Sequence, residues 1–232
     1  HSLGLFHNDY VSVDFTDPNR QTLLAGGHEQ SQRVWRSTDG GQTWPTNVGA
    51  TIPPNTRFST DPLIINSQTY VVNLSGWASG TAGIFRTTNG GASWQPGSAL
   101  GPNDGPPLVT TNGTIYWSTG GGYQRSMDSG ATWTQVGNNL HQVTPAEGPG
   151  GQIVSASGAN LVMSADNGAT WTPFGPSLPY TPAGVIYSTS RKAFFIWHWD
   201  CGGVVLPDAI MRLDVDPGLP VPGAPTGLRI LP

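Results

Sequence analysis

The sequence predicts an all-β protein folded as a β-propeller, in which four-stranded antiparallel blades surround a central channel. Short apolar runs alternate with turn-forming stretches along a chain that contains 32 glycines and 21 prolines. One phrase of eight residues occurs four times, and its final tryptophans are 50, 39 and 38 residues apart. A repeat near 40 residues with strands inside each unit is typical of a propeller blade. The four copies are STDGGQTW (residues 37–44), TTNGGASW (87–94), SMDSGATW (126–133) and SADNGATW (164–171).

The repeated phrase has the chemistry of a hairpin turn. Its first Ser or Thr ends a strand, and its Asp or Asn can accept hydrogen bonds from N–H groups of the same turn. The glycine at the fifth position can adopt a positive φ, and the tryptophan can bury a large face against the neighbouring sheet. The phrase is therefore predicted to build the scaffold. Its acceptors are Asp39, Asn89, Asp128 and Asp166, and its fifth-position glycines are Gly41, Gly91, Gly130 and Gly168.

With these four near-complete matches to S-x-D-x-G-x-T-W, the chain resembles the Asp-box (bacterial neuraminidase repeat) family of the sialidase and xyloglucanase superfamily. The resemblance covers about residues 1–216. It implies that the box is a structural element remote from the active site. Independently, an arginine recurs just before three of the turns, and this recurrence favours packing between blades or pairing at the surface over substrate binding; the three are Arg36, Arg86 and Arg125.

Each turn is expected at the tip of the hairpin between the third and fourth strands of a blade, and this places the other strands. An Asn112-Gly113 pair is typical of a two-residue hairpin turn. The expected strands cover residues 10–15, 22–27, 33–37 and 43–47; 62–67, 69–75, 83–87 and 93–97; 106–111, 114–119, 122–126 and 132–136; 141–146, 152–157, 160–164 and 170–174; and 183–190, 193–199 and 209–215.

The fifth unit lacks an outer strand, whereas residues 1–6 have no blade of their own. Pairing of residues 1–6 with 209–215 would close a five-bladed ring through an N-to-C strand clasp and remove the exposed edges. The alternative is a fragment of a six- or seven-bladed ring. Residues 1–216 are thus assigned to the propeller. Residues 217–232 are rich in proline and glycine, resemble a linker into a fibronectin-III-like domain, and suggest one module of a larger protein.

Composition excludes several classes of function. Only 10% of the residues are charged, the net charge is −4, and no basic run could bind a nucleic-acid backbone. No stretch approaches the roughly 18 apolar residues of a membrane span, and the chain opens without a signal segment. The single cysteine, Cys201, excludes an internal disulfide framework. With one lysine, the composition favours a secreted protein, and neither a cofactor nor a metal is expected.

Carboxylates are expected where the first strands begin, on the channel face opposite the repeated turns. Asp9, Asp61 and Asp104 occupy this place in three consecutive units, and Arg57 lies beside the second. Each Asp taken singly could equally be a turn former. A metal held by the three acids is possible, but no His or Cys spacing supports a transition metal. The three aspartates are the candidate catalytic residues, and Arg57 is a candidate for substrate binding.

Further candidates for substrate binding follow the second strands on the same face. Acids beside exposed aromatic rings are typical of sugar sites, because rings stack on pyranose faces and carboxylates bond hydroxyl groups. These candidates are His28, Glu29, Trp77, His198, Trp199 and Asp200.

Three functions fit this pattern. A glycoside hydrolase needs two carboxylates about 5.5 Å apart for retention or about 6.5–9.5 Å apart for inversion. Sialidase activity is disfavoured, because the chain has only two glutamates, Glu29 and Glu147, and no Arg-Ile-Pro motif. Xyloglucanases of the superfamily use two aspartates but are larger double propellers. The alternatives are a non-catalytic, lectin-like glycan-binding propeller and a protein-interaction scaffold. The sequence favours a carbohydrate-active module, with carbohydrate as its partner.

Overall fold

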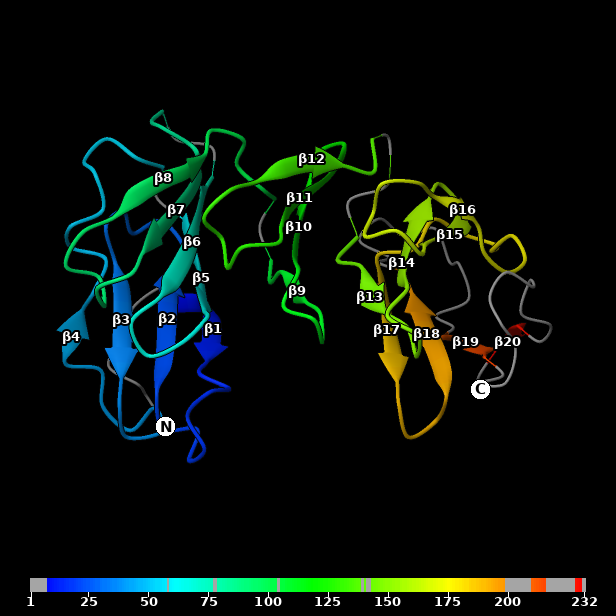
Figure 1. The fold of residues 1–232 in the computed structure, drawn as a ribbon, viewed down its shortest axis with the longest axis horizontal. Coiled ribbons are helices and arrows are strands. Elements are labelled where there is room, and N and C mark those ends of the chain that lie inside the picture. Colours follow the sequence, from blue (N-terminus) through cyan, green and yellow to red (C-terminus); the bar gives the residue numbers. More distant parts are fainter. Residues whose placement is uncertain are drawn as a thin grey trace. The chain divides into compact units, whose positions relative to one another are not determined.

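The computed structural model describes residues 8–57, 59–76, 79–103, 105–138, 140, 143–198, 210–215 and 228–230, and of Asp9, Ser59 and 228–230 only the backbone. Within these residues the chain forms twenty strands and no helix, hence no helix that could cross a membrane. The strands form five antiparallel sheets of four strands each (Figure 1). The all-β prediction is confirmed.

The chain divides into two compact units. The first comprises residues 1–107, 113–119 and 124–134, and the second comprises 108–112, 120–123 and 135–232, so the division passes through the sheet of β9–β12. The two sheets that lie wholly in the first unit consist of β1 (Asn8–Val13), β2 (Leu23–Gly27), β3 (Val34–Ser37) and β4 (Thr46–Asn47), and of β5 (Ser59–Ile64), β6 (Tyr70–Ser75), β7 (Gly83–Thr87) and β8 (Gln95–Ser98).

The remaining sheets follow the same order, each strand pairing with the next along the chain. They consist of β9 (Leu108–Val109), β10 (Ile115–Thr119), β11 (Gly122–Ser126) and β12 (Thr134–Val136); β13 (Ala146–Glu147), β14 (Ile153–Ser157), β15 (Asn160–Ser164) and β16 (Thr172–Pro173); and β17 (Gly184–Ser188), β18 (Ala193–Trp197), β19 (Met211–Asp214) and β20 (Leu228–Ile230).

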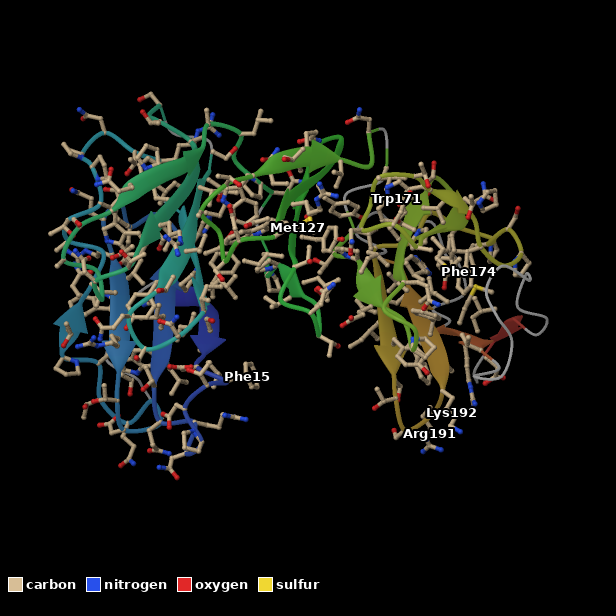
Figure 2. The ribbon with its side chains drawn as sticks, in the orientation of Figure 1. Phe15, Met127, Trp171, Phe174, Arg191 and Lys192 are labelled. Atoms are coloured by element: carbon tan, nitrogen blue, oxygen red, sulfur yellow. The ribbon has the colours of Figure 1, made fainter. Side chains whose placement is uncertain are left out.

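Apolar side chains from neighbouring sheets form the cores. Strand β6 is buried along its whole length. Its β-branched and aromatic residues favour this position inside a sheet. In the second unit, Phe194 of β18 packs edge-on against Phe174, with ring centroids 5.7 Å apart. Figure 2 shows Arg191 and Lys192 at the tip of the β17–β18 hairpin. The principal cores are Leu24, Val34, Val48, Ile52, Ile64, Tyr70, Val72, Leu74, Phe85 and Trp94 in the first unit, and Val143, Val154, Leu161, Met163, Phe174, Leu178, Tyr180, Phe194, Ile196 and Leu213 in the second.

The four repeat turns (residues 37–44, 87–94, 126–133 and 164–171) share one hydrogen-bond pattern, except that in the second turn the bond between the side chains of its third and seventh residues runs in the opposite direction. In the first, Ser37 Oγ donates to Asp39 Oδ1 at 2.7 Å and accepts from the Gly41 N–H at 2.9 Å. Asp39 also accepts from the backbone N–H and the hydroxyl of Thr43, at 2.9 and 2.6 Å. These bonds lower the pKa of Asp39 to about 2, chiefly through the Thr43 hydroxyl. The third and fourth turns repeat this arrangement.

The second repeat turn also fastens two sheets together. Trp94 Nε1 donates to Val48 O of the preceding sheet's final loop at 3.0 Å, and Thr51 Oγ1 donates to Gly91 O at 2.5 Å. Arg86, just before this turn, donates from Nε to Ser129 O of the third repeat turn at 2.9 Å. For Arg86, the predicted role in packing between repeats is therefore confirmed.

The N-to-C clasp predicted from the sequence is wrong. Strand β19 pairs with β18 along one edge and with β20 along the other. Residues 228–230 supply the outer strand of this sheet, so β19 has no open edge for the predicted pairing. Residues 1–6 themselves lie outside the described residues. The segment predicted as a linker (217–232) thus contains a strand.

Candidate functional site

Asp61 lies inside a strand rather than in the loop before it. The sequence placed it at a strand entrance, but β5 begins at Ser59, and Asp61 pairs with Asn73 of β6. Its side chain is only 2% exposed. Asp61 Oδ2 accepts hydrogen bonds from Asn73 Nδ2 at 3.1 Å and from the Gly105 N–H at 3.3 Å. The carboxylate therefore joins two strands to the loop that precedes β9.

Asn73 extends this polar cluster, and sequence reasoning missed it as a site residue. It is fully buried, and its Nδ2 also lies 3.3 Å from the carbonyl oxygens of Pro102 and Asn103. Trp117 Nε1 donates to Gly105 O at 2.8 Å and holds the far side of the loop. One amide in the apolar run YVVNLS was the available signal, because a buried amide requires hydrogen-bond partners.

Thr60 connects Asp61's strand to the loop that carries His28 and Glu29. Its hydroxyl accepts from the Gly27 N–H at 2.9 Å and donates to Arg33 O at 2.8 Å, so it holds both ends of the 28–33 loop. A Cβ at Gly26 would lie 1.7 Å from Thr60 O, which shows how closely β2 and β5 approach. His28 and Glu29 thus begin a loop that is held next to the start of β5.

An open concavity lies on this loop. It has a volume of about 420 Å³ and is lined by Glu29, Gln30, Ser31 and Arg33. Glu29 and Arg33 are exposed, and Glu29 adopts a positive φ of 59° that bends the loop sharply. Carboxylate, amide, hydroxyl and guanidinium groups therefore line one surface. Gln30, Ser31 and Arg33 were not among the sequence candidates, since nothing distinguishes them locally from an ordinary polar loop.

The side chain of Arg57 is hydrogen-bonded to a nearby backbone carbonyl. Arg57 Nη1 donates to Gly76 O at 2.7 Å, and its backbone N–H donates to Thr81 O at 3.1 Å. The half-buried side chain thereby fastens the segment before β5 to the end of β6. The neighbouring candidate Trp77 lies outside the described residues.

His198 belongs to the second unit and is described with it. Its ring packs against Tyr180 with centroids 4.3 Å apart. Tyr180 donates its hydroxyl hydrogen to Ile196 O at 3.2 Å, and burial raises its pKa. Trp199, Asp200 and Asp104 lie outside the described residues. For Asp9, in β1, only the backbone is described.

Metal binding finds no support in the described part of the chain. No group of three or more His, Cys, Asp or Glu side chains there is arranged to hold a metal ion. Two aspartates of the repeat turns are engaged with their own turns, because hydrogen bonds from Thr170 lower the pKa of Asp166 to about 2 and hydrogen bonds from Thr43 do the same for Asp39.

The fold is shared with known propellers. No protein-family model and no curated protein matches the sequence. Among solved structures, YCF48 from Cyanidioschyzon merolae superposes with a TM-score of 0.62 and 15% identity, over 99% of this chain and 74% of that one. The GH74 xyloglucanase from Xanthomonas campestris superposes with a TM-score of 0.58 and 16% identity, over 98% of this chain and 38% of that one. The GH74 enzyme from Niastella koreensis superposes with a TM-score of 0.60 and 21% identity, over 88% of this chain and 29% of that one.

These likenesses establish the β-propeller fold and nothing finer. The chain spans about a third of the length of the GH74 enzymes.

Proposed function

We propose that the chain is a secreted carbohydrate-binding propeller of the Asp-box type, with five blades, acting as one module of a larger protein. The hydrogen-bond pattern shared by the four repeat turns supports the family. The five four-stranded sheets support the number of blades. The low lysine content supports secretion.

The observation that carries the glycan-binding proposal is the polar concavity on the 28–33 loop. Glu29 supplies acceptors for sugar hydroxyls, Arg33 supplies donors, and Gln30 and Ser31 supply both. Similarity in fold to the GH74 xyloglucanase agrees with a polysaccharide ligand.

Burial of Asp61 favours binding over hydrolysis. A catalytic carboxyl must reach the glycosidic oxygen, the anomeric carbon or the attacking water. Asp61 is 2% exposed, and two donors hold Oδ2. Asp61 is proposed to act as a positioning residue. It holds β5 in place, and the neighbouring Thr60 of β5 bonds both ends of the 28–33 loop that carries the concavity.

The test combines binding with product analysis. Affinity electrophoresis against a panel of soluble polysaccharides, xyloglucan included, should show retardation by at least one of them. Glu29→Gln and Arg33→Ala should each weaken that retardation about tenfold, because each removes charge-assisted hydrogen bonds. Arg191→Ala removes another exposed arginine, in the β17–β18 hairpin, and should change nothing.

Mass spectrometry of the same mixtures decides the catalytic question. The proposal predicts no new oligosaccharides. Products that disappear in Asp61→Asn would replace it with a glycoside hydrolase that uses this carboxyl, whereas no retardation by any polysaccharide would refute glycan binding.

Peptide binding is the second candidate, and relative chain length favours it. The chain covers 74% of one YCF48, against about a third of the GH74 enzymes. Another YCF48 structure, which superposes with a TM-score of 0.59, is described as bound to a D1 peptide. A peptide array probed with the purified protein tests this candidate. Sequence-selective capture that Arg33→Ala abolishes would support it, and a blank array would exclude it.

A further inference from the structure

A small pocket at the opposite end of the second sheet has a different chemistry. It lies beside the β7–β8 hairpin, whereas Asp61 and the 28–33 loop lie towards the other end of β5 and β6. Its volume is about 130 Å³, several times the roughly 10–15 Å³ that a cavity needs on this measure to hold one water molecule. Its polar wall is formed by Arg86, Thr88, Ser93 and Gln95, and Gly97 and Ala131 form part of the remainder.

The charge of this pocket is positive. Among the described residues, Arg86 is the one charged side chain that lines it, and none of them contributes a carboxylate. The hydrogen bond from Arg86 Nε to Ser129 O fixes the guanidinium group in place and uses one of its five N–H groups. In the adjoining third repeat turn, Asp128 directs its carboxylate to Ser126 and Thr132.

The second repeat turn differs from the other three at one chemically important position. It carries Asn89 where the others carry aspartate. Asn89 Oδ1 accepts from the Ser93 N–H at 3.0 Å, which fixes the orientation of the amide. Asn89 Nδ2 then donates to Ser93 Oγ, also at 3.0 Å.

This single difference reverses the polarity of a hydroxyl group. In the other turns, the hydroxyl groups of Thr43, Thr132 and Thr170 donate to the aspartate carboxylate. Ser93 accepts from Asn89 instead, so its O–H remains a donor for a ligand in the pocket.

We propose that this pocket binds an oxyanion: a carboxylate, sulfate or phosphate group. The Arg86 guanidinium supplies charge-assisted donors, and the Ser93 hydroxyl and the Gln95 amide supply neutral ones. The anion can be a free ion or the acidic group of a uronic acid or sulfated sugar.

The experiment is an NMR titration of the full chain at low ionic strength, where screening is weak. Sodium sulfate, sodium phosphate, sodium acetate and glucuronate are the probes, with sodium chloride at matched ionic strength as the reference. Saturable shifts are expected for the backbone amides of residues 86–95 and 129–131 and for the Trp94 indole N–H. Tighter binding of glucuronate than of acetate would assign the site to acidic sugars, and tighter binding of sulfate or phosphate would assign it to inorganic anions.

Three variants test the mechanism. Arg86→Gln should weaken binding about tenfold or more. Asn89→Asp introduces the aspartate that occupies this position in the other three turns, so the turn should still fold. It should abolish anion binding, because it adds a negative charge and its carboxylate accepts the Ser93 hydroxyl hydrogen. Ser93→Ala changes no charge and should weaken binding severalfold.

Arg191→Gln is the control for loss of one positive charge and should leave the titration unchanged. Shifts that chloride reproduces, or affinities that survive both Arg86→Gln and Asn89→Asp in folded protein, would overturn the proposal.

Discussion

Replacement of Gly91 by alanine tests how the repeat turns hold the sheets together. Gly91 has a φ of +93°, and a Cβ there would lie 2.5 Å from Val48 O and 2.6 Å from Val48 Cβ. Gly41 holds the same position in the first repeat turn with a φ of +86°, but its nearest contact would be an ordinary 3.6 Å to Trp44 Cζ2. The pair therefore shares its backbone strain and differs in the contact with the preceding sheet.

The expected difference follows from these contacts. Both substitutions cost about 1–2 kcal/mol because an L-residue is forced into the left-handed region. Gly91→Ala adds about 1–3 kcal/mol of overpacking. Displacement of Val48 also costs about 1 kcal/mol through the Trp94 Nε1 hydrogen bond. Gly91→Ala should therefore be about 2–4 kcal/mol less stable than Gly41→Ala, and its Tm should be lower by at least about 4 °C.

Urea unfolding followed by tryptophan fluorescence measures this difference. Both residues lie in the first unit, so the same transition reports on both. Equal losses of stability in the two variants would refute the reasoning, because the contact between the second repeat turn and Val48 would then contribute nothing to the free energy of unfolding.

Three further predictions concern the turns and the second unit. The pKa values of Asp39 and Asp166 are lowered to about 2 from an ordinary 3.8. The two carboxylates therefore stabilise the folded state above about pH 4, and this stabilisation is lost as the pH falls to 2. The urea midpoint of the wild type should fall more steeply between about pH 5 and pH 2 than that of the double variant Asp39→Asn/Asp166→Asn. Tyr123→Phe should cost about 1–3 kcal/mol, because the buried Tyr123 hydroxyl bonds Val143 O and Ser155 Oγ; an unchanged denaturation midpoint would contradict this. Lys192→Gly should stabilise by about 0.5–1 kcal/mol, because Lys192 has a φ of +50°, whereas Arg191→Gly should not, and calorimetry of the two variants compares them.

The local features of the fold could be predicted from the sequence. The repeat turns are encoded in eight consecutive residues each, and β7, β11 and β15 have the bounds expected from their apolar runs. The strand expected at 141–146 differs in extent, because residues 143–145 are not in a strand and β13 covers Ala146–Glu147, whereas 141 and 142 lie outside the described residues.

Features that depend on distant partners could not be predicted. The pairing of β19 with β20 crosses a proline-rich segment, and nothing in the three residues of β20 identifies their partner. Asp61 was recognised as a carboxylate of interest, but its burial depends on Asn73 and on Gly105, 44 residues away. The pocket beside Arg86 likewise depends on two repeat turns that are distant in sequence, because Ala131 of the third turn lines it and Ser129 O of the same turn holds the Arg86 guanidinium.

The measurement that tests the central claim most directly is the dissociation constant of the Arg33→Ala variant, relative to wild type and Arg191→Ala, for the polysaccharide that retards the wild type most. The account predicts binding about tenfold weaker for Arg33→Ala and unchanged for Arg191→Ala, with no cleavage of the polysaccharide by any of the three. Equal affinities of all three proteins would contradict a glycan site on the 28–33 loop.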